Sequence, residues 1–306
     1  MADIVGIGAV VHDQMIIVDE YPPEDVKVSA KEAKVQSGGP CGVALISASK
    51  LGVPVKFLGK VGDDISGSIV RTNLSKYGVD ISDLKVVPGE QTRACIVISC
   101  QKNSTRTCIG TCPGTPGLQQ KPEEVNLEAI KEAKFLHIDG RDYNAAFYAA
   151  QKAKEFGTKI SMDIDNMAAT EWDELLRLVD IMVPAERCAV LLTGTKDIDE
   201  AARILYDRYH PEMLVVTQGP KGGVLIHDGV LSHYPCFKVD AIDSNGAGDV
   251  FHGSLVAALV KGMSPEEAVR FASASSAIKC RHFGASEGAP GYDEVIAFLE
   301  EHKDVQ

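Results

Sequence analysis

One segment decides the fold class: Asp243-Ser244-Asn245-Gly246-Ala247-Gly248-Asp249-Val250-Phe251-His252-Gly253, which follows an apolar stretch and opens a long helical pattern. Its Gly246-Ala247-Gly248 core lets backbone N–H groups at a helix N-terminus approach an anion, and the helix dipole favours negative charge there. Asp249 follows directly, where a general base could take a proton from an alcohol that attacks a bound phosphate. The same residues could also form a plain glycine-rich turn with an N-cap aspartate. The segment therefore has two interpretations, a phosphate site and a turn.

Three further segments favour the phosphate site. Residues 37–40 (SGGP) and 59–67 (GKVGDDISG) bracket the first long helical pattern, and each places backbone near a ligand or in a tight turn. Residues 215–223 (VVTQGPKGG) end a predicted strand in a glycine turn, which suits close approach by a nucleotide. A ligand site explains all of these glycine clusters together.

From residue 130 onward, short β-branched apolar runs alternate with helical patterns, as in βα units around a largely parallel sheet. The predicted strands are residues 135–138, 159–162, 181–183, 213–217 and 223–226. The predicted helices are residues 42–50, 65–77, 143–155, 197–209, 247–260, 265–281 and 292–302. The pattern predicts an α/β protein.

The N-terminal third has a different pattern, with strand-like runs separated by turn residues. The predicted strands are residues 4–11, 15–18, 26–29, 94–100 and 106–111. Hairpins in an α/β chain indicate a small β element laid against the main sheet. Such an element could act as a lid over a site.

Composition excludes several classes of partner. The 306 residues contain 31 Lys and Arg against 43 Asp and Glu, a formal net charge of −12, whereas nucleic-acid backbones are bound by clustered basic residues. No apolar run approaches the roughly 20 residues of a membrane span, and the start, MADIVGIGAVVHD, lacks the basic segment of a signal peptide. We therefore expect a cytoplasmic protein with no nucleic-acid and no membrane partner.

Taken in this order, the double glycine at 38–39, residues 59–67 and residues 243–253 resemble the signatures of the ribokinase-like carbohydrate kinase (PfkB) family over essentially the whole chain. The resemblance implies an α/β fold, Rossmann-like with three layers (α/β/α) and a small β-sheet lid. Residues 1–306 would form a single kinase domain, with its lid at about residues 14–30 and 93–111. It also implies ATP as the phosphoryl donor, Mg²⁺ as cofactor and a sugar-like alcohol as acceptor.

The resemblance also implies roles for catalytic and sugar-binding residues. Asp249 looks like the catalytic base, and the anion hole for the transferred phosphoryl group looks like Gly246, Ala247 and Gly248. Three positions match the sugar side of the family's site: Asp13, Gly38 and Gly39. A turn aspartate is the alternative for Asp13. Cationic residues that could meet an anionic group on the sugar include Lys27 and Arg141, although lone cationic residues are mostly solvated.

On the nucleotide side, the loop that matches the family contains Thr217, Gly219 and Gly222. Glu186 is the carboxylate expected to organise Mg²⁺ through water. Asp243, with carbonyl groups near Gly284, lies where the family often binds a monovalent cation such as K⁺.

Three departures from the family pattern affect these expectations. Val43 stands where the family has an asparagine that binds sugar. Ala185-Glu186-Arg187-Cys188 replaces the Asn-x-x-Glu segment that organises Mg²⁺, so that only Glu186 remains as a carboxylate there. Gly288 stands where many members have a serine in the cation loop, so K⁺ binding is left open.

We therefore predict an ATP-dependent kinase of a ketohexose, or of a ketohexose bearing an acidic group, acting on a primary hydroxyl. The segments look most like those of kinases for such substrates, including 6-deoxy-6-sulfofructose kinase. A ribose or nucleoside kinase of the same family, or a sensor that binds sugar or nucleotide without catalysis, are the alternatives. Because lid strands have unpaired edges, a homodimer through the lid is expected.

The chain contains no Gly-x-x-x-x-Gly-Lys-Ser/Thr motif, which excludes a P-loop enzyme.

Overall fold

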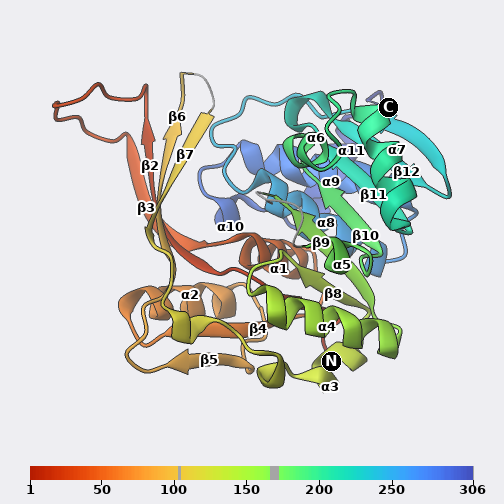
Figure 1. The fold of residues 1–306 in the computed structure, drawn as a ribbon. Helices are drawn as coiled ribbons and strands as arrows, with labels where there is room; N and C mark the ends of the chain where they lie inside the picture. The colour runs from red at the N-terminus through yellow and green to blue at the C-terminus, as the bar shows by residue number, and fades with distance from the viewer. Residues whose placement is uncertain (103–104, 166–171, 306) are drawn as a thin grey trace.

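A large sheet lies at the centre of the computed structural model, which describes residues 1–102, 105–165 and 172–305 (Figure 1). Its strand order within the described residues is β13-β12-β11-β10-β9-β8-β1-β4-β5. Neighbouring strands are parallel from β11 to β5, whereas β12 and β13 are antiparallel to their neighbours. The strands are β1 (Ile4–Ile7), β4 (Val55–Gly62), β5 (Leu84–Val87), β8 (Phe135–Ile138), β9 (Lys159–Ile164), β10 (Ile181–Pro184), β11 (Met213–Thr217), β12 (Gly223–His227) and β13 (Val230–Tyr234).

Helices cover both faces of this sheet and form two hydrophobic cores. One core contains side chains from α1 (Pro40–Lys50), α2 (Ile65–Lys76), α8 (Ala247–Val260), α9 (Pro265–Cys280) and α11 (Tyr292–Glu301). The other contains side chains from α3 (Leu127–Glu132), α4 (Tyr143–Phe156), α5 (Asp173–Leu176), α6 (Glu186–Thr193) and α7 (Ile198–Tyr209). Successive strand residues alternate between the cores, so Ile4 packs in the first and Val5 in the second. The result is a three-layer arrangement with strands that are apolar on both faces.

A second, smaller sheet stands beyond one side of the main sheet, as Figure 1 shows at the left. We call it the small sheet; it consists of β3 (Glu32–Gly38), β2 (Val11–Val18), β6 (Ala94–Cys100) and β7 (Thr105–Cys112), in that order. Met15, Ile17 and Val97 on its inner face pack against Phe283, which follows α9. The small sheet is thus held to the body by a C-terminal segment.

The α/β prediction is confirmed, and several elements match their predicted bounds, including β8, β11 and α8. The single strand predicted at residues 4–11 is wrong, because the chain leaves the main sheet after Ile7 and enters the small sheet at Val11. The strand predicted at residues 26–29 is also wrong. Val26 and Val28 are 49% and 58% exposed in the β2–β3 connection, and the ladder with β2 is formed from Glu32 onward. No strand of the described residues pairs with their alternating apolar pattern.

None of the described helices is both long and apolar enough to cross a membrane. The carboxyl ends of β1, β8, β9, β10 and β11 lie at one edge of the parallel sheet, which is where ligands bind in open α/β folds. The small sheet and the N-terminus of α8 meet the same edge, because their residues line one cavity with residues from β9 and β11. This edge is therefore the place to look for a site.

Candidate functional site

The N-terminus of α8 provides the backbone of the candidate site. Gly246 has a left-handed backbone (φ 77°), and a Cβ atom there would overlap Cβ of Ala285, so both its conformation and its surroundings require glycine. No described side chain caps this helix end. The N–H groups of its first turn are consequently available to an anion, which the helix dipole also attracts.

Asp249 lies in this first turn, and its half-buried side chain lines a cavity of about 480 Å³. Burial raises the pKa of Asp249 to about 7, and the nearby carboxylate of Asp163 adds to the rise. A carboxylate with this pKa can take up a proton near neutral pH more readily than an ordinary aspartate. The electrostatics thus suit a general base.

His252 follows Asp249 by one helical turn and pairs with Asp163 at the end of β9. Nε2 of His252 lies 3.1 Å from Oδ1 of Asp163, and both residues are about 5% exposed. Although burial acts in the opposite direction on each group, Asp163 raises the pKa of His252, and His252 lowers the pKa of Asp163. The pair therefore places a fixed ionic contact beside Asp249.

Asp139, at the end of β8, ties the sheet edge to α1. Its Oδ2 accepts hydrogen bonds from the backbone N–H groups of Ala9 (2.7 Å) and Cys41 (3.2 Å). Its Oδ1 accepts one from the N–H of Arg141 at 2.9 Å. This carboxylate positions the chain where it passes from the main sheet into the small sheet.

Asp13 lies on the opposite wall of the cavity, in strand β2 and not in the turn that was the alternative for it. Burial raises the pKa of Asp13 to about 7, and Asp249 contributes to the rise. A Cβ atom on Gly38 would overlap Oδ2 of Asp13. Gly39 has φ 89°, and a Cβ atom there would lie 2.5 Å from the carbonyl oxygen of Ala9. The glycine pair thus makes room for Asp13 and for a close backbone approach.

The cavity brings together seven of the residues that the sequence predicted for the site. The predicted residues that line it are Asp13, Gly39, Arg141, Thr217, Gly246, Gly248 and Asp249. A smaller cavity of about 110 Å³ shares Thr217 and Gly248 with it. The other predicted residues that line this smaller cavity are Gly219, Gly222 and Ala247. The two cavities therefore form adjoining compartments on either side of the α8 N-terminus.

Five predicted residues lie outside both linings: Asp243 and Gly284, which are described below, and Gly38, Lys27 and Glu186. Gly38 lies behind Asp13, as described above. Lys27 is exposed in the β2–β3 connection, which extends from the far end of the small sheet (Figure 1). Glu186 begins α6, and its Oε1 accepts a hydrogen bond from Nε2 of Gln218 (3.0 Å) and lies 3.4 Å from Nζ of Lys221. Glu186 is thus one side chain away from the loop that lines the smaller cavity.

Asp243 and Gly284 come together as predicted, because the N–H of Gly284 donates to Oδ2 of Asp243 at 3.0 Å. Ser99 of β6 donates to Oδ1 of Asp243 at 2.8 Å. Among the described residues, no group of three or more His, Cys, Asp or Glu side chains is arranged to hold a metal ion. A divalent ion at this edge would accordingly depend on ligands from a bound molecule and water.

Sequence reasoning missed several cavity residues, among them Asp163, Asp165, Arg187 and His252. Asp163 and Asp139 each occur at the carboxyl end of a buried strand, and that position was the available signal for them. Arg187 pairs with Asp165, with Nε of the arginine 2.9 Å from Oδ1. No pattern in the sequence indicates that contact, because it joins the loop after β9 to the first turn of α6.

Comparisons with known proteins show which proteins this chain is similar to. The chain is 28% identical to the ribokinase of Haemophilus influenzae over 96% of this chain and 97% of the relative. It is 30% identical to the Arabidopsis thaliana protein called "Probable fructokinase-2", over 96% of each. The structure superposes with a TM-score of 0.93 on a ribokinase-type protein of Agrobacterium tumefaciens, at 26% identity over 100% of this chain and 99% of that one.

A second solved structure is a ribokinase-type protein of Escherichia coli in complex with ATP and Mg²⁺. It superposes with a TM-score of 0.86 at 23% identity, over 99% of this chain and 100% of that one, which establishes a common fold. The sequence profile of the "pfkB family carbohydrate kinase" matches residues 1–291. The chain therefore belongs to the pfkB family of carbohydrate kinases, which are phosphotransferases acting on sugar hydroxyls.

Proposed function

We propose that this kinase transfers the γ-phosphoryl group of ATP to a primary hydroxyl of a ketohexose-like sugar, with Asp249 as the general base. The observation that carries the proposal is the position of Asp249. It lies beside the uncapped N-terminus of α8 and lines the same cavity as Asp13. A protein that only senses sugar or nucleotide needs no carboxylate of raised pKa at this point.

The proposed reaction is an in-line transfer. The acceptor hydroxyl gives its proton to Asp249, and its oxygen forms a bond to the γ-phosphorus while the bond to the β–γ bridging oxygen breaks, which releases ADP. The N–H groups of the Gly246–Gly248 turn bind the negative charge that the transferred group carries. Since backbone N–H groups are fixed before the reaction, little reorganisation is needed.

In this proposal the nucleotide lies along the smaller cavity. Thr217, Gly219 and Gly222 line it, and the shared residues Thr217 and Gly248 would bring the γ-phosphate into the larger cavity. The residues fit a Mg²⁺ ion held mainly by phosphates and water, with Glu186 contacting it through water. When bound, Mg²⁺ would neutralise charge on the β- and γ-phosphates. The related structure with ATP and Mg²⁺ supports both ligands.

The acceptor side favours a polar sugar with room for an anionic group. Asp13 would accept hydrogen bonds from sugar hydroxyls, whereas Val43 offers no polar contact. Arg106 and Arg141 also line this cavity, and neither forms an ion pair with a carboxylate of the described residues. Arginine side chains that face the cavity without a direct ion pair among the described residues would suit an acidic group on the acceptor. Lys27 would join them only if the small sheet moved toward the body.

We further propose that the small sheet is a lid over the acceptor and an interface between two copies of the chain. Because side chains alternate along a strand, the face opposite the cavity carries Ile16, Ile96, Ile98 and Ile109. Ile109 is 48% exposed, and Val35, beside the same face, is 55% exposed. A second copy would cover this apolar face and keep water from the acceptor side.

The experiment that tests the function is a coupled assay of ADP release with Mg·ATP and a panel of acceptors. The panel contains fructose, 6-deoxy-6-sulfofructose, ribose, phosphorylated hexoses, inositols and nucleosides. The proposal expects the highest kcat/KM with a ketohexose or its anionic derivative. The highest value with ribose or a nucleoside would overturn the substrate class, and no ADP release above the acceptor-free rate with any acceptor would favour the sensor.

A further inference from the structure

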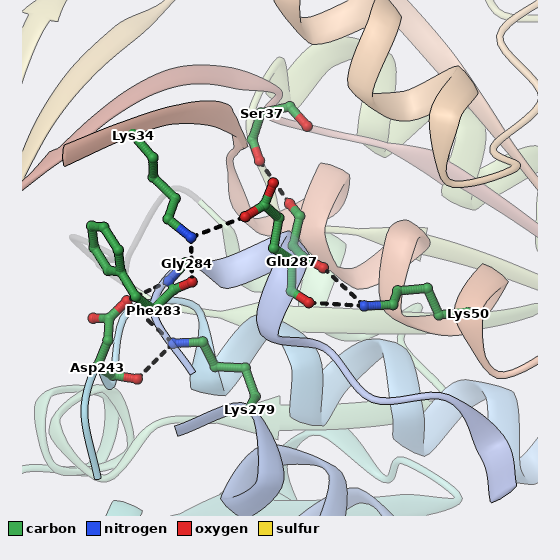
Figure 2. Close-up of polar contacts among 9 residues, drawn as sticks. Lys34, Ser37, Lys50, Asp243, Lys279, Phe283, Gly284 and Glu287 are labelled. Atoms are coloured by element: carbon green, nitrogen blue, oxygen red, sulfur yellow. Dashed lines mark hydrogen bonds and ion pairs between the residues drawn. The ribbon is translucent and has the colours of Figure 1, made fainter. Parts of the chain in front are cut away.

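Lys279, in the last turn of α9, is completely buried against the loop that leads to the phosphate site (Figure 2). Its Nζ donates to the carbonyl oxygen of Asp243 at 2.6 Å and lies 3.5 Å from Oδ2 of the same residue. Both side chains are fully shielded from solvent. Burial lowers the pKa of Lys279, and the Asp243 carboxylate opposes that fall. A buried lysine and aspartate in contact stabilise each other's charged forms.

Two further lysines bind the neighbouring loop, residues 283–288, as Figure 2 shows. Nζ of Lys34 donates to the carbonyl oxygen of Phe283 at 2.7 Å and to Oε2 of Glu287 at 2.9 Å. Nζ of Lys50 lies 3.4 Å from the carbonyl oxygen of Ser286 and 3.0 Å from that of Glu287. Three carbonyl oxygens of this loop, of the kind that bind an alkali-metal ion, therefore already accept hydrogen bonds from ammonium groups.

Gly288 completes the arrangement. A Cβ atom on Gly288 would lie 3.4 Å from Cε of Lys279 and 3.2 Å from the Lys279 carbonyl oxygen, which is tighter than an ordinary contact. A serine at this position would thus crowd the buried lysine side chain. The glycine that replaces the family's serine and the lysine that reaches Asp243 fit one another. Gly288 and Lys279 therefore belong to one site.

We propose that the Lys279 ammonium takes the place of the monovalent cation in this protein, so that neither its stability nor its phosphate site requires K⁺. The ammonium holds the Asp243 backbone and carboxylate, and Asp243 in turn accepts from the N–H groups of Asn245 and Gly284, at 3.0 Å each. Asn245 directly precedes Gly246, so this contact fixes the entry to α8. The inference deepens the proposed function by stating the ionic requirement of the same site.

The first test uses the unmodified protein and needs no acceptor. The melting temperature and the Kd for Mg·ATP are measured in about 100 mM KCl and in the same concentration of N-methylglucamine chloride. We expect the melting temperature to agree within about 1 °C and the Kd within about twofold, since a ligand that does not bind stabilises nothing. A clear K⁺-specific rise in melting temperature, or K⁺-dependent tightening of Mg·ATP, would overturn the inference. Failure of the proposed function, by contrast, would appear as absent Mg·ATP binding in both salts.

The second test asks whether Lys279 is the reason. In Lys279→Met combined with Gly288→Ser, the ammonium is removed and a hydroxyl is supplied, so the buried Asp243 carboxylate lacks a counter-charge. We expect this variant to be stabilised by KCl relative to N-methylglucamine chloride, and Lys196→Met, at an exposed lysine, to be unaffected. A folded double variant with no K⁺ response would contradict the assignment of Lys279. If the double variant does not fold, the comparison of salts on the unmodified protein still decides the question.

Discussion

Nε2 of His252 lies 3.1 Å from Oδ1 of Asp163, and this buried pair sits one helical turn from Asp249. Asp163 raises the pKa of Asp249, whereas the positive charge on His252 lowers it. The two partners therefore act in opposite directions on the proposed base. Burial is the largest cause of the rise, and together with the Asp163 charge it brings the pKa of Asp249 to about 7.

The pH dependence of the reaction should follow from this arrangement. Because a base works only in its ionised form, kcat/KM should rise with pH through about 7. Asp13 also has its pKa raised to about 7 and is coupled to Asp249, so the apparent value belongs to the pair. In His252→Gln the positive charge is lost, which raises the pKa of Asp249 further. In this variant the rise of kcat/KM with pH should therefore occur at higher pH than in the unmodified protein. A rise at the same pH or at lower pH would contradict this account.

Arg141 should distinguish anionic from neutral acceptors. Loss of a charged hydrogen bond costs about 1.5–3 kcal/mol, so Arg141→Ala should lower kcat/KM for an anionic ketohexose roughly tenfold to hundredfold and leave a neutral ketohexose nearly unchanged. Equal losses for both acceptors would refute the hypothesis that the acceptor is anionic, but not the hypothesis that it is a ketohexose. Lys27→Ala is the companion variant. A loss selective for the anionic acceptor in Lys27→Ala would show that the β2–β3 connection reaches the acceptor during turnover.

Much of this fold is predictable from the sequence, because buried parallel strands leave continuous apolar runs and helices leave a 3.6-residue period. The strands β8 and β11 and the helix α8 have the bounds that these patterns predict. The N-terminal strands are less predictable. Val26 and Val28 alternate with polar residues as in a strand, but they lie in an exposed connection, and within the part of the chain that the structure describes no strand pairs with them.

The candidate site is predictable only where a residue type carries its own signal. The glycines at the start of α8 are recognisable because a close backbone approach requires them, and Asp249 is recognisable because it is a carboxylate that follows them directly. The His252–Asp163 pair and the Lys279–Asp243 contact join residues 89 and 36 positions apart, respectively, and nothing local marks either one. Lys279 in particular resembles an ordinary helix-end lysine in the sequence, whereas its side chain is fully buried.

The Mg²⁺ requirement should depend on Glu186. If its carboxylate contacts the ion through water, Glu186→Gln should raise the Mg²⁺ concentration for half-maximal activity by about tenfold. Loss of a residue that contacts a metal only indirectly typically weakens metal binding or activity by about 10- to 100-fold, and tenfold is the lower end of that range. Titration of Mg²⁺ at fixed ATP measures this shift. Glu212→Gln, which alters an exposed glutamate paired with Lys159, is the matched control. An unchanged Mg²⁺ dependence in Glu186→Gln would remove this residue from the metal environment.

The small sheet should carry the dimer interface. Ile109→Lys places a charge on its exposed apolar face and should convert a dimer to a monomer, as measured by light scattering at micromolar concentration. Val230→Lys, at a residue that is 68% exposed on β13, should leave the dimer intact. A monomeric unmodified protein, or a dimer that persists in Ile109→Lys, would argue against an interface on this face.

The most direct test of the central claim is the turnover number of Asp249→Asn with Mg·ATP and the best acceptor of the panel. Asparagine keeps the size of the side chain but cannot accept the proton, so kcat should fall by roughly 10²–10⁴ while the Kd for Mg·ATP changes little. Asp240→Asn, at an exposed aspartate of the same loop, should turn over normally. Near-normal turnover in Asp249→Asn would contradict the assignment of Asp249 as the base.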